Sequence, residues 1–256
     1  MVEPSLTGML WAVGMMVIAI ALASWQGLGL SKTLAIATGR TLVQLLGVGI
    51  FLAFVFATRS PLVVLAVLLG MVTIAALVAR NRIDRELPRL LAWVWLAIFV
   101  SAVITMTYVS LFVIRLDPWY DPRYLIPLTG IVLGNAMTAA AIAGERLVTA
   151  LRNSRTEIET HLSLGATPVQ AVAAYRQAAI KAGLIPTINA MMVVGLVTLP
   201  GAITGQILAG ADPLIAAVYQ ILIMFMLALA TLIASLVVTH GIMRQFFTAA
   251  MQLVEP

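Results

Sequence analysis

The sequence has no cysteine and few charged side chains. Of its 256 residues only 10% are charged and 62% are apolar, whereas an average soluble domain carries about 25% charged residues. Without cysteine the chain has no disulfide, no thiolate nucleophile and no cysteine-based metal site. No polar stretch is long enough to form a separate soluble domain. We therefore expect one transmembrane domain over residues 1–256.

Signatures of catalysis and of nucleotide binding are also missing. The sequence contains no G-x-x-x-x-G-K-[ST], H-E-x-x-H or G-x-S-x-G pattern. Its two histidines, His161 and His240, are far apart in the chain. No acidic residue lies inside an apolar run, where an intramembrane hydrolase would need one. The sequence therefore argues against an enzyme, and we assign no catalytic, cofactor-binding or metal-ligating residue.

What the sequence has in abundance is apolar runs of about 20 residues, each long enough to cross about 30 Å of hydrocarbon. Irregular backbone in lipid would leave N–H and C=O groups unpaired, so these runs must be helices. The sequence predicts an all-α, polytopic membrane bundle of about seven transmembrane helices. We place them at Leu6–Trp25, Leu42–Ala57, Pro61–Ala79, Leu90–Ile114, Leu125–Ala143, Pro186–Ala209 and Leu214–Thr239.

Basic residues are divided unequally between the two sets of loops. One set holds only Arg59, Arg115 and Arg123, and the other holds the remaining twelve of the 15 Lys and Arg residues. The richer side is cytoplasmic, so we expect a multi-pass protein of the cell (inner) membrane with its N-terminus outside and its C-terminus in the cytoplasm. Tyr124 falls at the outer boundary, as interfacial aromatics do. The basic charge thus reflects topology and does not indicate nucleic-acid binding.

Residues 144–185 form the longest cytoplasmic connection, and their pattern is helical throughout. Ser154-x-x-Glu157 suits a capping box, so we expect the helix to restart there. Gly165 suits a helix C-terminus. Thr167 suits an N-cap and Pro168 the first helical position after it. The pattern predicts a helical elbow that transmits motion into the membrane.

The sequence also predicts where this connection ends. We expect Gly183 to end the last cytoplasmic helix and Pro186 to open the next membrane span. Within that span, Pro200 lacks an N–H and stands beside Gly201, which predicts a local kink. Broken helices in transporters often lie at binding sites or gates.

Two of the predicted spans contain uncharged polar side chains. At this depth such residues usually face the bundle interior or a cavity, although hydrogen bonding between helices is an equally simple reason for them. Our hypothesis assigns to a substrate pathway Asn135, Met137, Thr138, Thr198, Pro200, Thr204 and Gln206. Methionines are alternative ligands for soft metals, but they more often fill irregular gaps in a core. Those within the spans include Met106, Met137, Met191, Met192, Met224 and Met226.

Arg40 and Gln44 are one helical turn apart where the second span begins. Arg40 either extends its guanidinium to the lipid head groups or pairs with Glu145, which follows the fifth span on the same side. We assign Arg40, Gln44 and Glu145 to a cytoplasmic gate.

Four stretches of the chain resemble a known family. They are Arg40–Leu46 (RTLVQLL), Gly134–Ala140 (GNAMTAA), Leu164–Pro168 (LGATP) and Leu199–Leu208 (LPGAITGQIL). The chain resembles the FetB-type permeases, bacterial iron-export ABC transporter subunits with plant relatives linked to aluminium tolerance. The resemblance implies a permease homodimer that exports iron or another metal. It also implies a separate ABC ATP-binding subunit, which would hold ATP and Mg.

A looser likeness concerns the elbow. Glu159–Ala166 is similar to the EAA coupling loop of ABC importers, although Thr160 and His161 replace its two alanines and the closing proline comes only at Pro186. The likeness implies a role in docking to the ATP-binding subunit, but it does not imply import. The residues concerned are Glu159, Leu164, Gly165, Ala166, Thr167 and Pro168.

A second class of function fits the same spans. A stand-alone secondary carrier or channel for a small solute is the alternative, but it would need buried ionisable residues to couple to ions, and none lies in the predicted spans. The residues leave the substrate open, because Asn, Thr and Gln suit a sugar-like or lipid-like solute as well as a metal.

Overall fold

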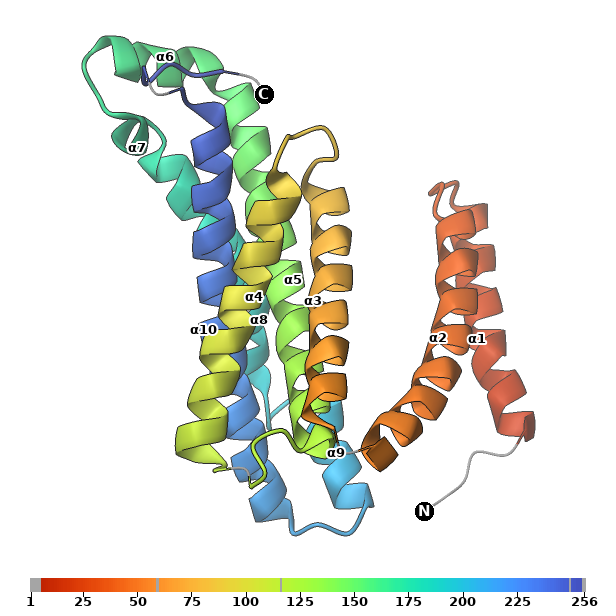
Figure 1. Cartoon of the computed structure of the whole chain (residues 1–256). Coiled ribbons are helices and arrows are strands. Elements are labelled where there is room, and N and C mark those ends of the chain that lie inside the picture. The colour runs from red at the N-terminus through yellow and green to blue at the C-terminus, as the bar shows by residue number, and fades with distance from the viewer. Residues whose placement is uncertain (1–5, 59, 116, 249, 255–256) are drawn as a thin grey trace. The chain divides into compact units, whose positions relative to one another are not determined.

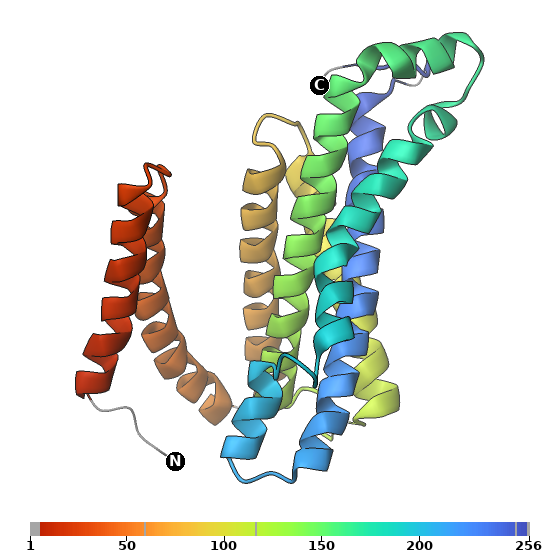
Figure 2. The ribbon, with the colours of Figure 1, turned by 180° about the vertical axis from the view of Figure 1, so that it is seen from behind.

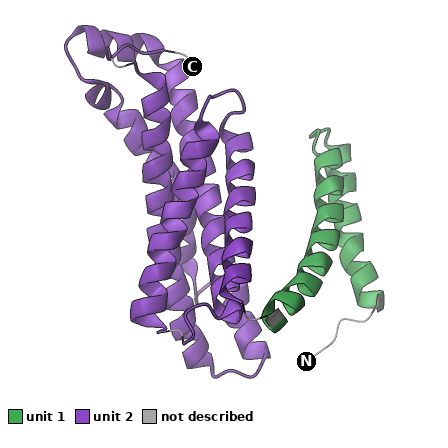
Figure 3. Ribbon diagram, viewed as in Figure 1, with its two compact units in different colours: residues 1–59 green, residues 60–256 purple. Residues whose placement is uncertain are grey.

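The computed structural model describes residues 6–58, 60–115, 117–248 and 250–254. These residues form helices and no strand, as the sequence predicts. The chain divides into two compact units, residues 1–59 and 60–256 (Figure 3). We describe each by itself.

Unit 1 is a helical hairpin. Its helices α1 (Leu6–Trp25) and α2 (Ser31–Thr58) are joined by a short turn in which Gly27 and Gly29 have positive φ. The second helix begins at Ser31, whereas the sequence placed the start of its membrane span at Leu42. The charges of Lys32 and Arg40 lowered the hydropathy of this stretch, but it contains no proline and continues the helix.

Unit 2 is a bundle around two long helices, α5 and α10. Helix α10 packs against α4, α5, α8 and α9, and α5 packs against α3, α4 and α8 (Figures 1 and 2). The chain passes from α4 into one π-helical segment, η1, before α5. The bounds are α3 (Pro61–Ile83), α4 (Leu90–Tyr108), η1 (Val109–Val113), α5 (Pro122–Asn153), α8 (Ala173–Val193), α9 (Gly201–Leu208) and α10 (Pro213–Phe246).

Gly183 marks a close approach of α8 to α5 and α10. A Cβ at this position would lie 2.8 Å from the carbonyl oxygen of Ala139 and 2.9 Å from Oγ of Ser235. The prediction that Gly183 ends a helix and that Pro186 opens a new one is wrong, because α8 runs through both residues. Gly183 is there to let α8 pack closely against α5 and α10. A single proline in a membrane helix is tolerated when its surroundings satisfy the freed carbonyl.

Six helices in the described part of the chain are long and apolar enough to cross a membrane. The predicted span at Pro186–Ala209 is not among them, because it is discontinuous. Helix α8 ends at Val193, residues 194–200 are not helical, and α9 begins at Gly201. The predicted kink at Pro200 is therefore a complete break. Gly195 has φ +82°, and the Val193 carbonyl accepts several amides of the following segment, which closes the helix there.

The elbow consists of two short helices, α6 (Arg155–Ser163) and α7 (Pro168–Ala171), at one end of unit 2 (Figure 1). Helix α5 continues without a break to Asn153, and a new helix starts after Ser154, as predicted. The predicted capping box at Ser154 is not formed, because its side chain makes no capping hydrogen bond.

Candidate functional site

The tip of the elbow is a tightly bonded turn. Gly165 has φ +92°, its N–H donates to the Leu162 carbonyl, and the N–H of Ala166 donates to the His161 carbonyl, both at 3.0 Å. This pair of bonds is the Schellman motif, which satisfies the free carbonyls at a helix C-terminus and favours glycine. The predicted helix end at Gly165 is confirmed.

The helix that follows has a complete capping box. The amide of Gln170 donates to Oγ1 of Thr167 at 3.4 Å, and the amide of Thr167 donates to Oε1 of Gln170 at 2.9 Å. Pro168 occupies the first turn. The capping roles predicted for Thr167 and Pro168 are confirmed, and their docking role stays a prediction. Gln170 was missed, although the Thr-x-x-Gln spacing is visible in the sequence.

Two apolar side chains point outward from this rigid tip. Leu164 is 80% exposed and Val169 is 61% exposed, whereas Ala171 and Val172 are buried. Ala166 is half-buried. On α6, Glu159 accepts from Arg155 at 2.8 Å and is otherwise exposed. The elbow therefore presents a small apolar surface outside the membrane helices.

Ion pairs tie neighbouring segments to the base of the elbow. Arg152, near the end of α5, bonds Asp84 in the turn between α3 and α4 at 2.8 Å. Glu145 lies 3.6 Å from Arg82. The turn after α3 and the end of α5 thus lie at the same end of unit 2, as the loop charges predict.

Glu145 was assigned to a gate with Arg40 and Gln44. Those two residues belong to unit 1 and Glu145 to unit 2, so their pairing stays a prediction. The partner that the structure gives to Glu145 is Arg82, which sequence reasoning did not propose.

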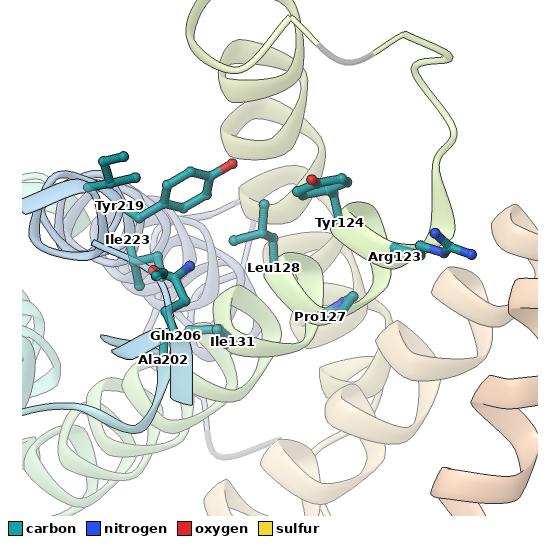
Figure 4. A pocket seen from close by; sticks show the side chains of 11 residues that line it. Arg123, Tyr124, Pro127, Leu128, Ile131, Ala202, Gln206, Tyr219 and Ile223 are labelled. Carbon is teal, nitrogen blue, oxygen red and sulfur yellow. The ribbon is translucent and has the colours of Figure 1, made fainter. Parts of the chain in front are cut away.

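The first cavity lies at the opposite end of unit 2 from the elbow, between α5, α9 and α10. It has a volume of about 450 Å³. Figure 4 shows Tyr124, Leu128 and Ile131 of α5 together with Gln206 of α9 and Tyr219 and Ile223 of α10. The other lining residues are Arg123, Pro127, Ala202, Ala211 and Ile215.

The polar groups of the first cavity are one guanidinium, two phenols and one amide. Arg123 and Tyr124 are exposed at its rim, while Gln206 and Tyr219 are half-buried. No carboxylate, imidazole or thiol belongs to the described lining. These groups donate and accept hydrogen bonds, so the cavity can hold a polar or anionic solute against an apolar wall.

A second cavity of about 380 Å³ lies beside the break between α8 and α9, which comprises residues 194–200. It is lined by Met191, Val194, Gly195, Leu199, Pro200, Ile203, Ala217, Gln220, Ile221, Met224 and Phe225. Almost all of this lining is apolar. Gln220 is 4% exposed, and within the described chain its Oε1 has no hydrogen-bond partner.

The predicted pathway residues do not come together in one place. Gln206 lines the first cavity and Pro200 the second. Thr198 is exposed in the break, and Thr204 donates back to the carbonyl of Pro200 at 3.2 Å.

The three pathway candidates on α5 line neither cavity. Asn135 donates from Nδ2 to the Ile131 carbonyl and Thr138 from Oγ1 to the Gly134 carbonyl, each at 2.9 Å. Met137 is half-buried. Their role in a pathway stays a prediction.

Sequence reasoning missed four residues that line these cavities. Arg123 counted only as a loop charge and Tyr124 only as an interfacial aromatic. Tyr219 and Gln220 lie inside a strongly apolar run, and hydropathy alone was enough to predict that run as a membrane span. The signal available for these two residues was a polar side chain one or two turns inside an apolar run. The same signal led to the prediction of Gln206.

Comparison with known proteins finds relatives that match nearly the whole chain. A UPF0014 membrane protein of Synechocystis sp. is 53% identical over 95% of this chain and 94% of its own length. The probable iron export permease protein FetB of Escherichia coli is 32% identical, over 95% and 92%. The protein ALUMINUM SENSITIVE 3 of Arabidopsis thaliana is 34% identical, over 94% and 87%.

No solved structure matches the chain. The family model described as "Uncharacterised protein family (UPF0014)" matches residues 6–247. The expected resemblance to the family of FetB is confirmed, and the chain is a multi-pass membrane protein that belongs to the UPF0014 family.

Proposed function

We propose that this chain is the transmembrane permease subunit of an ABC exporter, in which two copies work with two ATP-binding subunits. The family supports the proposal, because one relative is named as a probable iron export permease. The bundle supports it as well, since two cavities lie along helices that lead to a rigid elbow.

The elbow is the observation that carries the proposal. It exposes Leu164 and Val169 outside the membrane helices, and both ends of its turn are closed by hydrogen bonds. An apolar surface on a rigid turn suits docking to a partner protein. The elbow joins α5, which lines the first cavity, to α8, which lines the second. A partner that moves when it binds ATP would therefore move the walls of both cavities.

The alternative of a secondary carrier has less support. Such a carrier couples transport to ions through ionisable residues inside the membrane. In the part of the chain that the structure describes, the buried polar side chains are those of Ser, Thr and Gln, and no Asp, Glu, Lys, Arg or His is buried. Energy from a partner ATPase accounts for transport without such residues.

Iron or another metal is the proposed cargo, and this part of the proposal rests on the name of the relative. Among the described residues no group of three or more His, Cys, Asp or Glu could hold a metal ion. The polar groups of the first cavity would instead contact ligands that the cargo carries with it.

The docking surface can be tested with two point variants. Leu164→Glu and Val169→Glu should each abolish co-purification with the ATP-binding subunit, because a charge replaces an exposed apolar contact. Thr156→Glu on α6 is the matched control, since it adds the same charge at another exposed site of the elbow. Point variants are preferable to a deletion of the elbow, because Ala171 and Val172 are buried. Full recovery of the ATP-binding subunit with both tip variants would refute the docking role.

A further inference from the structure

The irregular backbone of the break between α8 and α9 needs a covering surface that this chain alone does not supply. Helix α9 has eight residues, which at about 1.5 Å per residue span about 12 Å. The break is thus about 12 Å from the end of α9, and about 18 Å of helix separates it from Lys181, the last charged residue of α8. With these two points at the membrane surfaces, the break falls inside a hydrocarbon layer about 30 Å thick. Irregular backbone is tolerated at that depth only where protein or a water-filled cavity covers it.

The hydrogen bonds of the break leave backbone groups unpaired. The Val193 carbonyl accepts amides from residues 196–198, and the amide of Gly195 donates to the Thr198 carbonyl at 2.9 Å. Among the described residues, nothing donates to the carbonyls of residues 195–197, and the amide of Leu199 has no acceptor. The same short segment therefore offers both free acceptors and a free donor.

The side chains of the break show what kind of surface covers it. Leu196 is 88% exposed and Val197 is 81% exposed. Two large apolar side chains are a poor lining for a water-filled path, while lipid tails cannot bond the free carbonyls beside them. A protein surface satisfies both the side chains and the backbone.

Helix α9 continues this surface with small residues. Gly201 and Gly205 are both exposed, and a Cβ at either position would meet nothing within 4 Å. They form a G-x-x-x-G pattern, which lets two membrane helices approach closely. Leu208, on the same side of the helix, is 73% exposed, whereas Ile203 faces inward and is buried.

We propose that this broken-helix face, made of Leu196, Val197, Gly201, Gly205 and Leu208, docks against the same face of a second copy of this chain. A two-fold pair brings the same patch together from both subunits, so the surface must be self-complementary. This one is, since G-x-x-x-G packs on G-x-x-x-G and each break offers the other a free amide donor and free carbonyl acceptors. The inference rests on the two-copy arrangement of the proposed function and locates its interface.

The absence of native cysteine makes the interface directly testable. Single variants Leu196→Cys, Val197→Cys and Leu208→Cys are oxidised in membranes of cells that express the full chain, with and without a short thiol-reactive cross-linker. A lone cysteine forms a disulfide only with another molecule, so a covalent homodimer on a non-reducing gel reports the proposed contact. We expect several-fold more homodimer than from Ile74→Cys on α3, which is also exposed and apolar at 65%.

A second variant tests the packing motif. Adding Gly201→Leu or Gly205→Leu to the Leu208→Cys chain should lower cross-linking several-fold. The Cβ of each new side chain would meet nothing within 4 Å in the chain, so the fold of unit 2 should persist, with unchanged thermal unfolding of purified protein. Cross-linking no stronger than that of Ile74→Cys would overturn the proposal.

Two further outcomes are decisive. If α2 of the same chain covered this face, Leu196→Cys combined with Ile50→Cys would give an intramolecular bond and no dimer, which would also overturn the proposal. The elbow variant Leu164→Glu separates the docking of the ATP-binding subunit from the contact between two copies of this chain. Loss of the ATP-binding subunit should leave Leu196→Cys cross-linking intact. Cross-linking that persists there would support the interface even if the docking role failed.

Discussion

Asp84 accepts an ion-paired hydrogen bond from Arg152 at 2.8 Å, and this bond ties the turn after α3 to the base of the elbow. The Asp84 side chain is only 10% exposed, so water replaces the lost bond poorly. Asp84→Asn should reduce the free energy of unfolding by about 1.5–3 kcal/mol, the range for hydrogen bonds to charged groups. A lower midpoint of thermal unfolding in detergent would show it.

The exposed pair of Arg155 and Glu159 is the control for this effect. Its two side chains are 52% and 47% exposed, one helical turn apart on α6. Exposed pairs of this spacing contribute about 0.5 kcal/mol or less, so Glu159→Gln should leave the unfolding midpoint nearly unchanged. Equal losses from the two variants would mean that the Asp84 bond is worth no more than a surface pair.

Membrane topology is the second prediction. A reporter fused after Arg85 should be cytoplasmic, and one inserted within residues 118–122 should be external, because basic residues gather on the side of Arg85. The ion pairs of Arg152 with Asp84 and of Arg82 with Glu145 place this turn at the end of unit 2 that carries the elbow. Reporter activity in the cytoplasm from the second fusion would reverse the arrangement of unit 2.

Gly183 gives the third prediction. In Gly183→Ala the new Cβ would lie 2.8 Å from the carbonyl oxygen of Ala139, which is closer than van der Waals contact allows. Helix α8 must then move away from α5 and α10, at a cost of about 1–3 kcal/mol. The thermal unfolding midpoint of the purified chain should fall.

Gly134→Ala is the matched control on α5. A Cβ there meets nothing within 4 Å, and alanine is favoured over glycine inside a helix by about 1 kcal/mol. This variant should be as stable as the parent chain or more so. A similar loss in both variants would show that the effect of Gly183→Ala comes from something other than close packing.

Hydropathy predicted the membrane helices well, because it averages over about 20 residues and so tolerates single exceptions. The same averaging hid the break at residues 194–200, since Val194, Leu196 and Val197 are as apolar as any helix interior. Their backbone leaves the helix because Gly195 turns to positive φ and Pro200 cannot donate. A local backbone effect of this kind does not register in a hydropathy average.

The tip of the elbow was largely predictable, because caps depend on local sequence, although the capping box expected at Ser154 did not form. Gly165, Thr167 and Pro168 each have the role that capping chemistry gives them. The first cavity was less predictable, because it forms where separate helices meet. Gln206 was found as a polar residue in an apolar span, but nothing in the sequence placed Tyr219 beside it.

Gln206 and Asn135 give the last prediction, since the structure gives these two amides different surroundings. Gln206 lines the first cavity (Figure 4), whereas Asn135 donates to the Ile131 carbonyl of its own helix at 2.9 Å. Leucine has as many side-chain heavy atoms as asparagine and one fewer than glutamine, and it removes the amide. Gln206→Leu should therefore reduce substrate-stimulated ATP hydrolysis by the reconstituted complex more than Asn135→Leu does.

Basal hydrolysis should persist in both variants, because neither residue lies near the elbow that we propose docks the ATP-binding subunit. The measurement compares stimulation by a panel of iron complexes and small solutes at equal amounts of assembled complex. Tyr219→Phe is a milder companion, since it removes one hydroxyl from the same wall as Gln206 and keeps the ring. If Asn135→Leu abolished stimulation while Gln206→Leu and Tyr219→Phe retained it, the pathway would pass along α5 away from the first cavity, and the cavity would have no part in transport.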